Sequence, residues 1–267
     1  MGIILTNGDS FTYGDELIGS RSLDGNDTHH HYTYTHQLST MLDKKYVNLG
    51  KNGSSNSKIY RETMQFLQST SKKIDLLVIT WTNWGRFEIA NDFQLEGDKI
   101  VHIPFDTNMN QIIPSHRSRQ FVYDTMNDEI PERSRVLKEY IEDVLTIQTQ
   151  IIHGLSYMRN IQWMCDMLGI KVMQGIIHSG SWHNLLFTMR HKEGWEQYYD
   201  YVDESLKYLR DECRIGLGHY IDIYSLADKI EGSEIRPGGH VCEKTQYAYA
   251  EMMYNISKDK GWFSVTD

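Results

Sequence analysis

The sequence predicts a doubly wound α/β protein built around a parallel β-sheet. Short apolar runs bounded by polar residues alternate along the chain with longer segments in which apolar residues recur every three or four positions. The first pattern is typical of strands that are buried on both faces, and the second of helices that cover such a sheet. Ligands of these proteins bind beyond the carboxyl ends of the strands, so we expect the functional residues there.

The predicted elements follow one another in a regular order. We expect strands at residues 3–6, 46–49, 76–80, 170–176 and 220–223. We expect helices at residues 34–42, 57–70, about 133–168, 195–212 and about 243–257. The segment from about residue 87 to residue 132 interrupts this order, carries three of the four prolines and contains a hairpin-like run at residues 93–102. We treat it as an insertion, either a lid or substrate wall or an excursion without function, within a single domain that spans residues 1–267.

The composition excludes several classes of protein. Hydrophobic residues make up 40% of the chain and charged residues 24%, which is enough apolar material for a core at this length. The formal net charge of -9 disfavours binding to nucleic acids or to anionic membranes. No apolar run approaches the roughly 20 residues of a membrane span, no signal peptide is visible, and scattered cysteines argue against disulfide bonds. We therefore expect a cytoplasmic protein, whose oligomeric state the sequence leaves open.

A serine follows the first predicted strand directly, in the run Asn7-Gly-Asp-Ser10. Gly8 allows the chain to turn sharply and brings the backbone close to a ligand. Ser10 then begins a helical turn, where free N–H groups would favour an anion beside it. Ser10 is therefore a candidate nucleophile, although Asp9 and Ser10 could also serve only as caps of this turn.

Two further loops are expected at the same edge of the sheet. Gly53 lies in the loop after the second strand, and Asn83 lies in the loop after the third. The backbone N–H of Gly53 and the side-chain amide of Asn83 could meet at an oxyanion beside Ser10, where acyl transfer builds negative charge on the carbonyl oxygen. Each residue alone is also compatible with ordinary turn chemistry.

A histidine lies between the fifth predicted strand and the last helix. A serine hydroxyl becomes an effective nucleophile when a base such as imidazole takes its proton. His240 is placed in the sequence to do so, although by itself it could also cap the helix that follows. The combination of Ser10, Gly53, Asn83 and His240 favours acyl-transfer chemistry.

This arrangement resembles the SGNH/GDSL hydrolase family, whose name lists the serine, glycine, asparagine and histidine of its four motif blocks. The matching positions, in chain order, are Gly8-Asp9-Ser10, Asn48-x-Gly50-x-x-Gly53, Asn83 and His240. The resemblance implies a flavodoxin-like three-layer α/β/α sandwich with a five-stranded parallel sheet. It also implies hydrolysis of carboxylic esters or thioesters through an acyl-enzyme, with no metal or organic cofactor. Ser10 would attack with His240 as base, while the N–H groups of Ser10 and Gly53 and the amide of Asn83 would hold the oxyanion.

Two positions depart from the family pattern. Trp81 stands where the family usually has glycine, which would narrow or reshape the pocket, and Pro237 stands where the family usually has an aspartate three residues before the histidine. Glu234, Asp228 or a main-chain carbonyl could orient the imidazole of His240 instead. These departures leave open a weak or inactive protein of the same fold that binds carbohydrate or has a structural role. Acyl transfer to an alcohol would use the same residues as hydrolysis.

Aromatic residues gather in the loops expected around the site. Trp84 and Trp182 are candidate substrate walls for sugar rings or an aryl acyl group, although aromatic side chains also fill cores. His178 would line the pocket at the end of the fourth strand. Arg86 could bind a carboxylate or phosphate, or form a surface ion pair. We expect a small-molecule or O-acetylated glycan ester as substrate, and no metal, because the histidine clusters lack the ligand spacing of zinc sites.

Overall fold

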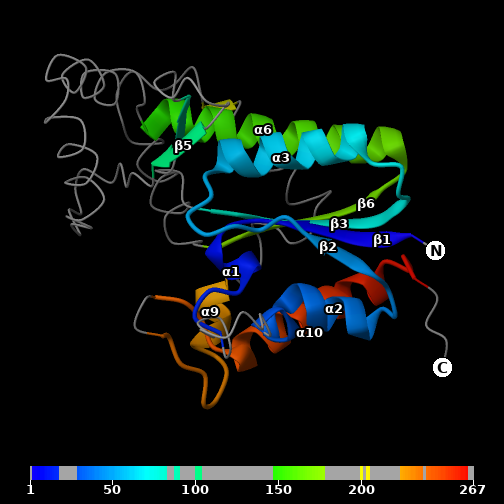
Figure 1. Ribbon diagram of the computed structural model, residues 1–267, viewed down its shortest axis with the longest axis vertical. Helices are drawn as coiled ribbons and strands as arrows, with labels where there is room; N and C mark the ends of the chain where they lie inside the picture. Colours follow the sequence, from blue (N-terminus) through cyan, green and yellow to red (C-terminus); the bar gives the residue numbers. More distant parts are fainter. Residues whose placement is uncertain are drawn as a thin grey trace, which may run out of the picture.

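The protein is a three-layer α/β/α sandwich, with a parallel sheet between two layers of helices (Figure 1). Its structure is a computed structural model that describes residues 2–17, 29–82, 87–90, 100–103, 147–177, 199–200, 203–204, 223–236 and 239–263. Among the helices of these residues, none is both long enough and apolar enough to cross a membrane.

The central sheet has four described strands in the order β2-β1-β3-β6, and all neighbouring pairs are parallel. The strands are β1 (Ile3–Asn7), β2 (Tyr46–Asn48), β3 (Ile74–Trp81) and β6 (Lys171–Ile176). After β1 the chain continues to β2 on one side and then returns to β3 on the other. The carboxyl end of β1 is therefore a switch point of the sheet, where α/β proteins of this type bind ligands.

The helices divide between the two faces of the sheet (Figure 1). One face is covered by α3 (Asn56–Ser69) and α6 (Ile147–Leu168). The other is covered by α2 (Tyr34–Met41), α9 (Ile223–Ala227) and α10 (Glu243–Asp259). The short helix α1 (Ser10–Tyr13) follows β1, and a 3-10 helix, η1 (His29–Tyr32), precedes α2. A separate antiparallel pair joins β4 (Phe87–Ala90) to β5 (Ile100–Ile103).

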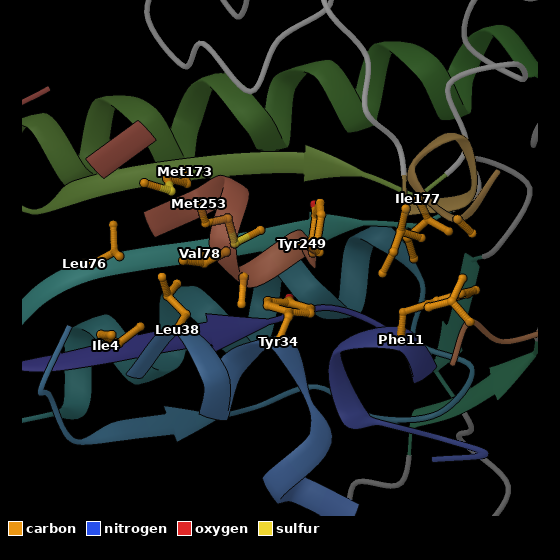
Figure 2. Packing of buried hydrophobic residues seen from close by; sticks show 14 residues of the cluster. Ile4, Phe11, Tyr34, Leu38, Leu76, Val78, Met173, Ile177, Tyr249 and Met253 are labelled. Carbon is orange, nitrogen blue, oxygen red and sulfur yellow. The ribbon is translucent and has the colours of Figure 1, made fainter. Parts of the chain in front are cut away.

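The core forms because neighbouring strand residues point to opposite faces of the sheet. Toward α2 and α10 the strands contribute Ile4, Leu76, Val78 and Met173, which pack on Tyr34, Leu38, Tyr249 and Met253 (Figure 2). Toward α3 and α6 they contribute Leu5, Leu77, Ile79 and Val172, which pack on Ile59, Leu155, Met158 and Ile161. Two apolar layers, one on each face, therefore hold the sheet between the helices.

Most predicted elements are confirmed to within a few residues. The fifth predicted strand is the exception: residues 220–222 lie outside the described part of the chain, and Ile223 begins α9 instead of ending a strand. Ile223 and Ala227 are both buried and lie four positions apart, which is the spacing of one helix face. The hairpin in the predicted insertion exists, but its first strand is Phe87–Ala90, before residue 93. Only the second part of the long helix predicted from residue 133, and four residues of the one predicted at 195–212, are described.

Candidate active site

The serine turn begins where β1 ends. Asp9 is the N-cap of α1, and its Oδ1 accepts a hydrogen bond from the Phe11 N–H at 3.1 Å. Capping therefore falls to Asp9, and Ser10 is the first residue of the helix, with 5% of its surface exposed. Gly8 is required before it, because a Cβ there would collide with the side chain of Thr12 and lie 3.0 Å from the Thr80 carbonyl oxygen.

The structure brings His240 to Ser10 across 230 residues of sequence. Nε2 of His240 lies 2.7 Å from Oγ of Ser10. The histidine is carried by a tight turn, in which the Arg236 N–H donates to the His240 carbonyl at 2.6 Å and the Gly239 N–H donates to the Arg236 carbonyl at 2.8 Å. The Phe11 ring packs against the imidazole with 4.9 Å between centroids. Together these contacts fix the ring beside the serine.

A carboxylate occupies the other side of the imidazole. Oε2 of Glu16 lies 2.9 Å from Nδ1 of His240, and the backbone N–H of His240 donates to the same oxygen at 3.4 Å. The side chains of His240 and Glu16 are only 15% and 9% exposed. Glu16 has a φ of 61°, and a left-handed conformation of a residue other than glycine costs about 1–3 kcal/mol. Strain of this kind is typical of functional positions, where the surrounding structure enforces it.

Neither acidic residue named in the sequence analysis lies at this position. Glu234 pairs with Arg236 at 2.7 Å, and its side chain is 60% exposed. Asp228 is an exposed residue just beyond α9. Both expectations placed the acid near the histidine in sequence, as the family pattern does. The only sequence signal for Glu16 was its position six residues after the serine, on the far side of a glycine.

The loop after β3 is tied to the serine turn by buried polar contacts. Oγ1 of Thr82 donates to Oδ2 of Asp9 at 2.6 Å. The Thr82 N–H donates to the Asn56 side chain at 2.9 Å, and the Asn56 amide donates back to the Thr82 carbonyl at 3.2 Å. All three residues are buried. This network holds the ends of β1 and β3 and the start of α3 in one arrangement before any ligand binds.

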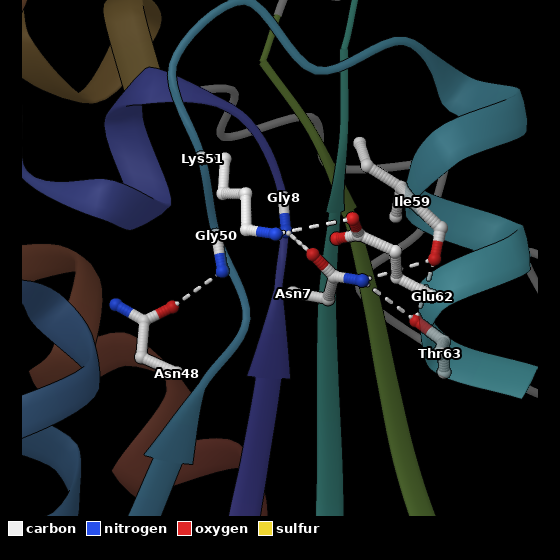
Figure 3. A network of polar contacts seen from close by, with 8 residues as sticks. All are labelled: Asn7, Gly8, Asn48, Gly50, Lys51, Ile59, Glu62 and Thr63. Atoms are coloured by element: carbon white, nitrogen blue, oxygen red, sulfur yellow. Dashed lines mark hydrogen bonds and ion pairs between the residues drawn. The ribbon is translucent and has the colours of Figure 1, made fainter. Parts of the chain in front are cut away.

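The loop after β2 is held close to α1. The Asn48 amide donates to the Thr12 carbonyl at 2.7 Å. The Asn48 side-chain oxygen accepts from the Gly50 N–H at 2.9 Å, a contact drawn in Figure 3. A Cβ at Gly50 would lie 2.8 Å from Cγ2 of Thr12, so only glycine allows this close approach. Gly53 follows in the same loop with a φ of 68°, which also suits glycine. The predicted oxyanion donor Gly53 therefore belongs to a loop that contacts the serine helix.

The same edge is anchored to α3 by Asn7 (Figure 3). Its oxygen accepts from the Gly8 N–H at 2.8 Å, while its amide donates to the Ile59 carbonyl and the Thr63 hydroxyl, both at 3.0 Å. Because these contacts are buried, the point where β1 turns into the serine loop is fixed on the α3 side of the sheet as well.

Two buried residues in the layer of α2 and α10, neither of them among the predicted site residues, support α1. Gln246, on α10, donates to the Phe11 carbonyl at 3.0 Å and accepts from the Tyr34 N–H at 2.9 Å. The hydroxyl of Tyr34 contacts Oγ1 of Thr12 at 2.9 Å and Oγ1 of Thr80 at 2.8 Å. Burial disfavours the phenolate and raises the pKa of Tyr34 to about 12. The helix that follows His240 is thus joined to the helix that carries Ser10.

Trp81 does not reshape a pocket, contrary to the expectation from its position. Its side chain is fully buried in the cluster that faces α6, and its indole N–H donates to the Gln174 side chain at 2.9 Å. Because side chains alternate along β3, Trp81 points to the face of the sheet that packs on α3 and α6, and Tyr34 packs on the other face. Five predicted site residues lie outside the described part of the chain, namely Asn83, Trp84, Arg86, His178 and Trp182. Pro237 lies outside it as well.

Within the described residues, no group of three or more His, Cys, Asp or Glu side chains could hold a metal ion. The imidazole of His240 contacts Ser10, and the carboxylate of Glu16 contacts the other side of that imidazole. This set can remove a proton from a hydroxyl and stabilise the imidazolium that results, which is the chemistry of an activated serine.

The sequence matches no protein-family model and no curated protein. Solved structures with a similar fold include a catalytic mutant of an acetylxylan esterase from Geobacillus stearothermophilus, with 11% identity, a TM-score of 0.46 and coverage of 98% of this chain and 96% of that one. A member of the lipolytic protein G-D-S-L family from Veillonella parvula covers 94% of this chain and 96% of its own at 13% identity and a TM-score of 0.39. An esterase of the SGNH-hydrolase family covers 97% and 94%, at 13% identity and a TM-score of 0.40. The case for the chemistry of this chain therefore depends on the geometry at Ser10.

Proposed function

We propose that the protein is a serine hydrolase that cleaves carboxylic esters, with Ser10 as nucleophile and His240 as general base. The observation that carries this proposal is the 2.7 Å contact between Oγ of Ser10 and Nε2 of His240 at the switch point of the sheet. A hydroxyl this close to a neutral imidazole nitrogen can transfer its proton as it attacks a carbonyl carbon.

The reaction has two stages. Oγ of Ser10 bonds to the carbonyl carbon while its proton passes to Nε2 of His240, and the imidazolium then protonates the leaving alkoxide. Water attacks the resulting acyl-enzyme with His240 again as base, which releases the acid and restores Ser10. In both stages the oxyanion is held by the backbone N–H groups of Ser10 and Gly53 and by the side chain of Asn83. These steps need no metal or organic cofactor.

The substrate class follows from the predicted loops. Trp84 and Trp182 would offer flat apolar faces, and His178 and Arg86 would offer polar contacts at the mouth of the site. Such walls suit an O-acetylated glycan or a small-molecule ester. Transfer to an acceptor alcohol in place of water would use the same acyl-enzyme.

The proposal is tested by intact-protein mass spectrometry after reaction with a fluorophosphonate probe. The wild type should gain one probe mass, whereas Ser10→Ala should gain none and His240→Ala should react far more slowly. Hydrolysis of p-nitrophenyl acetate and of acetylated xylan by the same proteins then separates simple esters from glycan esters. A folded wild type that neither reacts with the probe nor cleaves either ester would overturn the proposal and favour a carbohydrate-binding role for the fold.

A further inference from the structure

We infer that Glu16 is the positioning carboxylate of this site, so that nucleophile and acid lie in one short segment, residues 10–16, and only the histidine comes from a distant part of the chain. This inference rests on the proposed function. It assigns the orienting role that the SGNH resemblance gives to an aspartate three residues before the histidine, a position occupied here by Pro237.

The contact between Glu16 and His240 fixes both the ring and its backbone. One oxygen, Oε2, lies 2.9 Å from Nδ1 and accepts from the His240 N–H at 3.4 Å. Since the opposite ring nitrogen faces Oγ of Ser10 at 2.7 Å, the imidazole is held from both sides. A carboxylate on Nδ1 keeps the proton there in the neutral ring and leaves the lone pair of Nε2 directed at the serine.

The turn after α1 is built to place this carboxylate. Gly14 ends the helix with a φ of 93°, and the N–H groups of Gly14 and Asp15 both donate to the Ser10 carbonyl at 2.9 Å. The Glu16 N–H then donates to the Asp15 side chain at 3.2 Å, and the buried side chain of Leu17 follows. Glu16 has a φ of 61°, and from this position its carboxylate reaches Nδ1 of His240.

The other acidic residues of the histidine turn are engaged elsewhere. Arg236 pairs with Glu234 through Nη1 and with Glu243 through Nη2, both at 2.7 Å. The carboxylate that meets His240 therefore comes from Glu16, across 224 residues of sequence. Its low exposure strengthens this hydrogen bond, because a hydrogen bond shielded from water acts in a lower dielectric.

The test compares Glu16→Gln with Glu234→Gln, which removes a carboxylate from the same neighbourhood without touching the imidazole. Glu16→Gln should lower kcat and the rate of probe labelling by about 10²–10⁴-fold with little change in KM, because an amide on Nδ1 no longer favours the productive tautomer. Glu16→Asp should recover part of the rate, and Glu234→Gln should stay within about threefold of the wild type. Nitrogen NMR of the His240 ring should show the proton on Nδ1 in the wild type and a changed tautomer population in Glu16→Gln.

A second variant guards against misfolding. Glycine adopts a φ near 61° without strain, so Glu16→Gly should fold and leave space for a small carboxylate. Added formate should then restore labelling of Ser10, and the same concentration should have no effect on Ser10→Ala or on Glu234→Gln.

The outcomes separate this inference from the proposed function. If the wild type reacts and Ser10→Ala does not, but Glu16→Gln reacts at the wild-type rate, the inference is overturned while the hydrolase proposal stands. An unchanged His240 tautomer in Glu16→Gln, or a Glu16→Gly variant that formate does not rescue, would also overturn it. If the wild type is inert, the proposed function fails, and the NMR comparison still decides whether Glu16 positions the ring.

Discussion

Removal of one buried hydroxyl, by Tyr34→Phe, should have an effect on stability that changes with pH. This hydroxyl contacts Thr12 and Thr80, and all three residues are fully buried between the serine helix and β3. Phenylalanine keeps the apolar packing but leaves these two threonines without their shared partner. At neutral pH we expect a loss of about 1–3 kcal/mol in the free energy of unfolding, the usual cost of an unsatisfied buried polar group.

In the alkaline range this loss of stability should become smaller. The pKa of Tyr34 is about 12 in the folded protein against 10.0 for an unperturbed tyrosine. Above pH 10 the unfolded chain therefore releases a proton that the folded chain keeps, and this favours unfolding of the wild type as the pH rises. The linkage relation gives about 1.4 kcal/mol at pH 11 and approaches about 3 kcal/mol above pH 12. Tyr34→Phe lacks this titration, so the stability gap between the two proteins should shrink.

Urea unfolding followed by circular dichroism at pH 8 and pH 11 measures both the loss of stability at neutral pH and its decrease at alkaline pH. The wild type should be the more stable protein at pH 8, and the gap should be about 1.4 kcal/mol smaller at pH 11. Comparing the two proteins at each pH cancels the titration of all other groups. An equal gap at both pH values would refute the inference that burial raises the pKa of this tyrosine.

Three further substitutions test the packing around the site. Trp81→Gly, which introduces the glycine usual at the corresponding position of SGNH proteins, should lower the stability to urea by about 3–5 kcal/mol, because it leaves a cavity in the core. A stable variant with altered ester preference would contradict this. Gly50→Ala should push Thr12 and α1 aside, cost about 1–3 kcal/mol and slow probe labelling at least tenfold, as mass spectrometry would show. Gln246→Leu should remove the hydrogen bond to the Phe11 carbonyl and lower thermal stability by a similar amount, and an unchanged melting temperature would show that this hydrogen bond does not stabilise the fold.

Local pattern was sufficient to predict the framework of the protein. The strands that carry Leu5, Leu77 and Val172 are short apolar runs, and burial on both faces leaves such runs little choice of structure. Because parallel strands end at the same edge, the order of the elements also placed Ser10 and His240 at one site, as the structure has them.

The parts that could not be predicted depend on contacts across the sheet or between distant segments. Trp81 was expected at a pocket because of its position in a motif, whereas the alternation of β3 points it into the core toward Gln174. Gln246 has no motif around it, and its role arises only because α10 lies against α1. The position of Glu16 beside His240 requires a left-handed backbone conformation, which residues other than glycine rarely adopt, so local sequence preference gives no signal for it.

The placement of Ser10 and Glu16 on one turn has a consequence for recognising relatives of this protein. If the short pattern Gly-Asp-Ser-x-x-x-Gly-x-Glu, read here from Gly8 to Glu16, contains both the nucleophile and its acid, only the histidine of the fourth motif block needs to be retained. Searches that require an aspartate three residues before that histidine would pass over such chains. A search for the nine-residue N-terminal pattern, combined with a histidine just ahead of the last helix, should retrieve homologues in which the acid lies at a different sequence position but still contacts the imidazole.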